Sequence, residues 1–67
     1  MPFIQVTIIE GRTSEQKEQL IYELSQAAAK TLQSPLENVR ITINEIPNSH
    51  WGIAGESVYK RQNSLQG

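Results

Sequence analysis

The sequence contains no cysteine and no aspartate among its 67 residues, and it has a single histidine. Without cysteine the chain can form neither disulfides nor thiolate metal sites, and one histidine leaves no plausible cluster of metal ligands. A lone domain of this size buries only about 60% of its unfolded surface. Disulfides, a structural metal and oligomerisation are the usual ways to stabilise so small a core. We therefore expect the chain to self-associate.

The chain also lacks an excess of either charge and any long apolar run. Six Lys and Arg residues oppose seven acidic residues, which gives a net charge of −1. Nucleic-acid binders normally carry a basic face, whereas here the cations are spread singly. No apolar run approaches the ~20 residues that span a bilayer, and the start MPFIQVTIIE does not resemble a signal peptide. We expect a cytoplasmic protein with no nucleic-acid or membrane partner.

The hydrophobic pattern predicts one α+β domain over residues 1–67. Alternating β-branched residues predict strands over residues 2–10 and 38–46. Between them, apolar residues at helical spacing predict a helix over residues 14–33, which begins at a capping box of Thr13 and Gln16. Its apolar stripe comprises Leu20, Leu24, Ala27, Ala28 and Leu32. Strand, long helix and strand in this order imply a right-handed parallel βαβ unit.

The remaining C-terminal segment is predicted to form a small hairpin or loop, followed by a polar tail that frays over about residues 62–67. One helix covers only one face of a two-stranded sheet, and two strands are too few for independent stability. The mixed outer face of the sheet must therefore meet other copies of the chain; it carries Gln5, Thr7, Thr42 and Asn44.

Pro2 is a candidate general base. Methionine aminopeptidases remove Met1 when the next residue is small, and the proline nitrogen then becomes a free secondary amine. An α-amino group titrates not far from neutral pH, and a base with that property at the end of a strand suits proton transfer. The alternative is that Pro2 merely begins a strand, where its missing N–H is harmless.

Two arginines could bind an anionic substrate beside such a base. Arg12 lies in the turn after the first strand and Arg40 on the polar face of the second, and a guanidinium holds a carboxylate through two parallel hydrogen bonds. Alternatively, Arg12 is a solvated turn residue, and Arg40 forms a cross-strand ion pair, for example with Glu45 of another subunit. Trp51 is either an interface anchor or the apolar wall of a pocket, and His50 is interpreted as a loop residue.

Four segments together carry a resemblance to a known family: the start MPF, then IIEGRTSEQK, NVRITINEIP and the glycine-rich HWGIAGE. The chain resembles the 4-oxalocrotonate tautomerases, also called 2-hydroxymuconate tautomerases, from its first residue to about Arg61. The resemblance implies a βαβ protomer with a C-terminal hairpin, assembled as a homohexamer, a trimer of dimers. It also implies an isomerase of aromatic hydrocarbon catabolism that needs no cofactor.

The resemblance further implies roles for five residues. Pro2 is the general base, Arg12 binds the distal carboxylate, and Arg40 engages the 2-oxygen and its adjacent carboxylate. The backbone amide of Ile9 and the side chain of Trp51 complete a substrate site that combines residues from more than one subunit. Pro2 would remove the 2-hydroxyl proton of a dienol such as 2-hydroxymuconate and return a proton to C5, which gives the 2-oxo isomer.

The chain departs from the family pattern at two positions. Trp51 replaces a usual Phe, and Ala54 stands where Gly is frequent, so the substrate preference and the hairpin geometry are expected to differ. Ile53 stands near the position where related dehalogenases use a carboxylate, which argues against hydrolytic dehalogenation. Two alternatives remain open: the same site acting on another enol or keto acid, such as an aryl enolpyruvate, and a non-catalytic oligomeric module.

Overall fold

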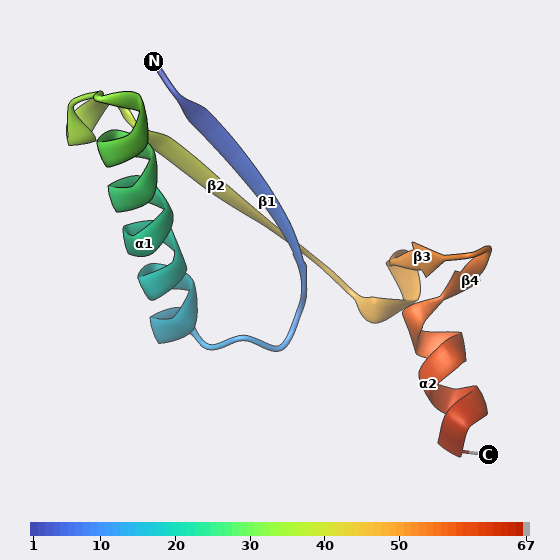
Figure 1. The fold of residues 1–67 in the computed structure, drawn as a ribbon. Coiled ribbons are helices and arrows are strands. Elements are labelled where there is room, and N and C mark those ends of the chain that lie inside the picture. The colour runs from blue at the N-terminus through green and yellow to red at the C-terminus, as the bar shows by residue number, and fades with distance from the viewer. Residues whose placement is uncertain (67) are drawn as a thin grey trace.

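The computed structural model describes residues 1–66, and the side chains of residues 1–63. Its elements are, in order, β1 (Phe3–Ile9), α1 (Ser14–Leu32), β2 (Arg40–Ile46), β3 (Gly52–Ile53), β4 (Glu56–Ser57) and α2 (Val58–Gln66). α1 lies along one face of the β1–β2 pair, and the β3–β4 hairpin with α2 forms an arm beyond the end of β2 (Figure 1). The predicted βαβ unit with a C-terminal hairpin is confirmed.

The two long strands run parallel, as predicted, with Phe3 opposite Arg40 and Ile9 opposite Ile46. Residues of β1 alternate between half-buried positions such as Ile4 and Val6 and exposed positions such as Gln5. β2 begins at Arg40 rather than at residue 38. The reason is a 3₁₀ turn over Leu36–Asn38, in which the backbone groups bond locally instead of to β1.

α1 begins as the sequence predicts. The Thr13 hydroxyl accepts a hydrogen bond from the Gln16 N–H at 3.1 Å, and the Thr13 N–H donates to the Gln16 side chain at 3.0 Å. The predicted stripe is only partly correct, because Ala27 and Leu32 are exposed whereas Ala28 is buried. A sheet of two strands is narrow, so it covers fewer helix positions than a full-width sheet would.

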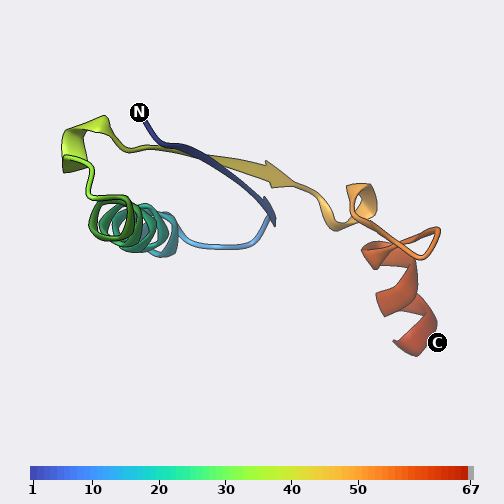
Figure 2. The same cartoon turned by 45° about the horizontal axis from the view of Figure 1, so that its top comes forward.

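The core of a single chain is very small. Among the described side chains, only Ala28 and Val39 are buried, each with 8% of its surface exposed. The chain extends over 50 × 25 × 15 Å. Figure 2 shows α1 on one side of the sheet and the other side uncovered. Phe3 alternates with the half-buried Ile4 of β1 and is 60% exposed. The folded chain thus leaves large apolar side chains exposed for contacts with other copies, as its small size predicts.

The C-terminal segment forms the predicted hairpin and then a helix that was not predicted. The β3–β4 hairpin turns through Ala54 and Gly55, both at positive φ (53° and 85°). The polar segment that follows is helical in α2 as far as Gln66, where the sequence predicted a frayed tail over about residues 62–67. The Ser57 hydroxyl accepts a hydrogen bond from the Lys60 N–H at 3.1 Å and so caps this helix.

Residue 67 lies outside the described residues, and the fraying of the chain end stays a prediction. No helix within the described part of the chain is long and apolar enough to cross a membrane.

Candidate active site

The first group of predicted site residues lies where β1 and β2 begin. The Arg40 N–H donates a hydrogen bond to the Pro2 carbonyl at 3.0 Å, which fixes Pro2 beside β2. Pro2 is half-buried, whereas Met1 before it is 81% exposed. The Arg40 guanidinium donates to the Glu37 carbonyl of the preceding 3₁₀ turn and is otherwise exposed. Pro2 and the Arg40 guanidinium thus lie at the same end of the sheet.

The second group lies at the opposite end of the sheet, where the parallel strands finish. A hollow of about 260 Å³ is lined by Thr7, Ile8, Ile9, Arg12 and Trp51. β1 supplies three of these residues, the turn after it supplies Arg12, and the segment after β2 supplies Trp51. The structure therefore brings Trp51 to Ile9 and Arg12, which lie far from it in the sequence. All three residues were predicted to act on one substrate.

Trp51 is held in place by backbone hydrogen bonds on both sides. Its N–H donates to the Asn48 carbonyl at 3.4 Å, and its carbonyl accepts from the Val58 N–H at 2.8 Å. The half-buried Trp51 borders the 260 Å³ hollow shared with Arg12 and also a second hollow of about 310 Å³. His50 borders the second hollow as well. His50 ends a short 3₁₀ turn and is exposed, in agreement with its interpretation as a loop residue.

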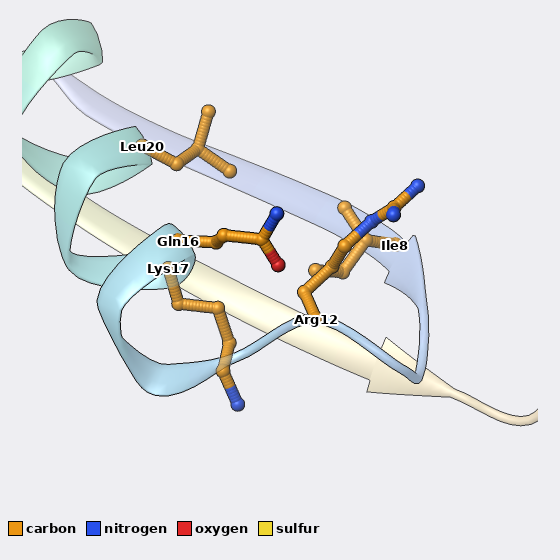
Figure 3. A pocket seen from close by; sticks show the side chains of 5 residues that line it. All are labelled: Ile8, Arg12, Gln16, Lys17 and Leu20. Atoms are coloured by element: carbon orange, nitrogen blue, oxygen red, sulfur yellow. The ribbon is translucent and has the colours of Figure 1, made fainter.

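Arg12 also borders a hollow of about 250 Å³ between β1 and the first turns of α1. Figure 3 shows this hollow with Arg12 directed toward Ile8, and Gln16 and Leu20 on the helix side. Arg12 is exposed, and it forms no ion pair with a carboxylate among residues 1–63. Its guanidinium is therefore available for an external anion.

Lys17 lines the same hollow, and its role was not predicted. Its ammonium group lies 2.8 Å from the Glu45 carboxylate of β2, and both side chains are about 30% exposed (28% and 31%). Glu45 was one predicted partner of Arg40 of another subunit, but its Oε1 atom accepts a hydrogen bond from Lys17 of the same chain. The sequence offers one indication of this ion pair. Alternate residues of a strand lie on the same face, so Glu45 shares the helix-facing side of β2 with Ile41 and Ile43.

Within one chain the two groups of residues are far apart. Pro2 precedes Ile8, the neighbour of Arg12, by six residues of extended strand, which corresponds to about 20 Å. A six-carbon diacid has a chain of carbon–carbon bonds that spans at most ~8 Å. One chain therefore presents two candidate half-sites, each with an arginine, that lie too far apart to hold such a diacid together.

The described residues offer little to a metal ion. No three His or Glu side chains gather in the manner of a metal site within the part of the chain that the structure describes. The chemistry that the two half-sites can support is binding of carboxylates by guanidinium groups and, once the proline nitrogen is free, proton transfer.

Comparison with known proteins identifies the family. Residues 2–61 match the model of the tautomerase enzyme family. A probable tautomerase of Ralstonia nicotianae is 60% identical over 82% of this chain and 79% of its own length. The 2-hydroxymuconate tautomerase of a Pseudomonas species (strain CF600) is 55% identical over 90% of this chain and 95% of its own length.

Solved structures show the same fold. The heterohexameric 4-oxalocrotonate tautomerase of Chloroflexus aurantiacus superposes with a TM-score of 0.87 at 42% identity, covering 90% of this chain and 97% of that protein. A 4-oxalocrotonate tautomerase isozyme from Methylibium petroleiphilum gives a TM-score of 0.91 at 38% identity, covering 94% of this chain and 98% of that protein. The resemblance inferred from the four sequence segments is thus confirmed. The chain belongs to the tautomerase family and is an enzyme of the isomerase class.

Proposed function

We propose that the protein is a cofactor-independent tautomerase that converts a dicarboxylate 2-hydroxydienoate, such as 2-hydroxymuconate, to its 2-oxo isomer in a homohexamer. The observation that carries the proposal is the pair of candidate half-sites. An arginine lies beside the amino-terminal proline, and a second arginine, without an ion-pair partner among residues 1–63, lies at the other end of the sheet. Two guanidinium groups, contributed by different subunits, would match the two carboxylates of such a substrate. Relatives named 2-hydroxymuconate tautomerase support the same substrate class.

In the proposed reaction the proline nitrogen, free after removal of Met1, takes the proton from the 2-hydroxyl group. The electron pair of that O–H bond forms the C2=O bond, and the C2=C3 pair moves to form C3=C4. The C4=C5 pair forms the new C5–H bond with the proton of the protonated proline. Atoms and electrons balance without an external reagent. The exposure of Met1 (81%) supports its access to an aminopeptidase.

The two arginines have different tasks in this proposal. Arg40, next to the base, stabilises the negative charge that develops on the 2-oxygen, which is a transition-state interaction. Arg12 binds the distal carboxylate and thereby orients the diene relative to the proline nitrogen. The backbone amide of Ile9 and the indole of Trp51 bound the substrate on the Arg12 side.

Assembly of several chains is part of the proposal. A complete site needs the Pro2 end of one subunit to meet the Arg12 end of another, because one chain separates them by ~20 Å. The uncovered sheet face and the nearly absent core of a single chain support such contacts. The heterohexameric relative shows that this fold can build a six-subunit assembly.

The direct test follows ketonisation of 2-hydroxymuconate by ultraviolet absorbance, with protein whose intact mass shows that Met1 is removed. Pro2→Ala keeps a free amine but loses the secondary amine, so we expect a rate loss of about 10²-fold or more. A matched control carries a short extension before Met1, which makes the proline nitrogen an amide and should abolish catalysis. Normal turnover by the extended protein would refute Pro2 as the base.

A second candidate substrate is an aryl enolpyruvate, and Trp51 in place of the usual Phe is the observation that favours it. The indole lies between two hollows and presents a large apolar face at the Arg12 end. An aryl substrate has no distal carboxylate, so Arg12→Ala should leave its turnover unchanged while impairing turnover of the dicarboxylate. Membership of an enzyme family goes against the non-catalytic alternative.

A further inference from the structure

We infer that Lys17 is a positioning residue: by holding the Glu45 carboxylate it keeps Arg12 unpaired and thus available to the distal carboxylate of the substrate. This inference rests on the proposed function, in which Arg12 binds that carboxylate. It begins from the only ion pair among the described residues, which joins Lys17 of α1 to Glu45 of β2 at 2.8 Å.

The ion pair lies at the same end of the molecule as Arg12. Glu45 is opposite Ile8 in the strand register, and Ile8, Arg12 and Lys17 line one hollow. Glu45 and Ile8 both project from the helix side of the sheet, since each shares parity with the half-buried positions of its strand. Two cations therefore border one hollow, and the Glu45 carboxylate is bonded to one of them and adjoins Ile8 of its lining.

The arrangement leaves one cation paired and the other free. Figure 3 shows the head groups of Lys17 and Arg12 diverging, with Arg12 directed toward Ile8 and Lys17 away from it. If Lys17 lost its charge, Arg12 would be the remaining cation that borders the hollow, next to Ile8, which is the strand neighbour of Glu45. A guanidinium also binds a carboxylate through two hydrogen bonds, whereas an ammonium group binds as a point charge.

An internal carboxylate on Arg12 would compete with the substrate for the same donors. The competition acts only on substrates that use Arg12, because it leaves the Pro2 end of the sheet unchanged. It acts on binding rather than on the proton transfer, so KM should change while kcat stays the same. A purely structural role of the ion pair would instead predict equal effects of removing either partner.

The experiment compares Lys17→Gln and Glu45→Gln on two substrates, 2-hydroxymuconate and 2-hydroxypenta-2,4-dienoate, which lacks the distal carboxylate. For Lys17→Gln we expect KM for the dicarboxylate to rise about three- to fivefold, the size of an exposed ion pair, with KM for the monocarboxylate unchanged. Glu45→Gln breaks the same ion pair but supplies no competitor, so it should leave the dicarboxylate KM at or below the parent value.

Three further proteins complete the design. The double variant Lys17→Gln/Glu45→Gln should restore the parent KM, and Lys17→Arg, which keeps the charge, should resemble the parent. Lys30→Gln removes one positive charge from the far end of α1 and controls for net charge. The rise in KM for Lys17→Gln should also shrink in about 0.5 M salt, where charges are screened within a few ångströms.

Equal effects of Lys17→Gln and Glu45→Gln, or an equal rise for both substrates, would overturn the inference. Failure of the proposed function has a different signature, because Arg12→Ala would then fail to distinguish the two substrates. If Arg12→Ala distinguishes them and Lys17→Gln does not, the role of Arg12 stands and the role of Lys17 is refuted.

Discussion

Because one chain places Pro2 and Arg12 at opposite ends of the sheet, two inactive variants should restore activity to each other. The two residues are separated by about 20 Å along β1, which exceeds the length of a six-carbon diacid by more than twofold. If a complete site takes Pro2 from one subunit and Arg12 from another, a mixed assembly of Pro2→Ala and Arg12→Ala chains contains some sites that carry both native residues.

The expected yield follows from random assortment. In an equal mixture, half of the subunits supply a native Pro2 and half supply a native Arg12, so about a quarter of the sites in a closed symmetric assembly are intact. We therefore expect about a quarter of the parental kcat per site after the two variants are unfolded together, mixed and refolded. Each variant refolded alone should retain only its own residual rate, and parental protein refolded alone gives the reference.

The measurement is initial rate of 2-hydroxymuconate ketonisation against the mixing ratio, with the subunit distribution determined by native mass spectrometry. The rate should follow a parabola with its maximum at equal mixing. A mixture that stays as inactive as its components, although mass spectrometry shows mixed assemblies, would refute the argument. In that case one chain would have to supply both residues to each site.

Two predictions concern stability, each measured as a urea midpoint at fixed protein concentration because assembly contributes to it. Ala54→Gly should raise the free energy of unfolding by about 0.5–1 kcal/mol, since Ala54 has φ 53° and an L-residue in that region costs about 1–2 kcal/mol before the entropy of glycine is subtracted. Gly55→Ala, at φ 85°, should lower it, and a lowered midpoint for Ala54→Gly would contradict the described turn. Thr13→Ala should lower it by about 1 kcal/mol because the cap of α1 is lost, whereas Thr13→Ser should retain most of it; equal midpoints for both would mean that the cap is not formed in solution.

Much of the fold could be predicted because its signals are local. Alternation of β-branched residues identified both strands, and the Thr13 capping box fixed the start of α1 to the residue. The order strand, helix, strand then left a parallel pair as the natural topology. α2 lacked such a signal, since its residues are mostly polar. Its capping hydroxyl at Ser57 and the 3.1 Å hydrogen bond between Asn48 and Gln62 depend on how the chain folds back.

The candidate site was predictable only as residue types in their local settings. The turn after a strand is a natural place for Arg12, but its neighbour Trp51 is brought to it by the path of the chain after β2. The ion pair of Lys17 and Glu45 joins residues 28 positions apart, and the segments that contain them do not indicate that the two side chains pair. The separation of Pro2 from Arg12 follows from strand length, which could have been calculated once β1 was recognised.

The stability of this chain and its proposed catalysis therefore both require contacts between subunits. Only Ala28 and Val39 are buried among the described side chains, so a lone protomer has almost no core with which to offset its conformational entropy. In the proposed function, the same protomer supplies one half-site at each end of its sheet. Contacts that cover the open sheet face can stabilise the fold and also bring the Pro2 end of one subunit to the Arg12 end of another. A chain of 67 residues without disulfides can in this way contribute to a site that no single subunit completes, and we expect activity only after the subunits have assembled.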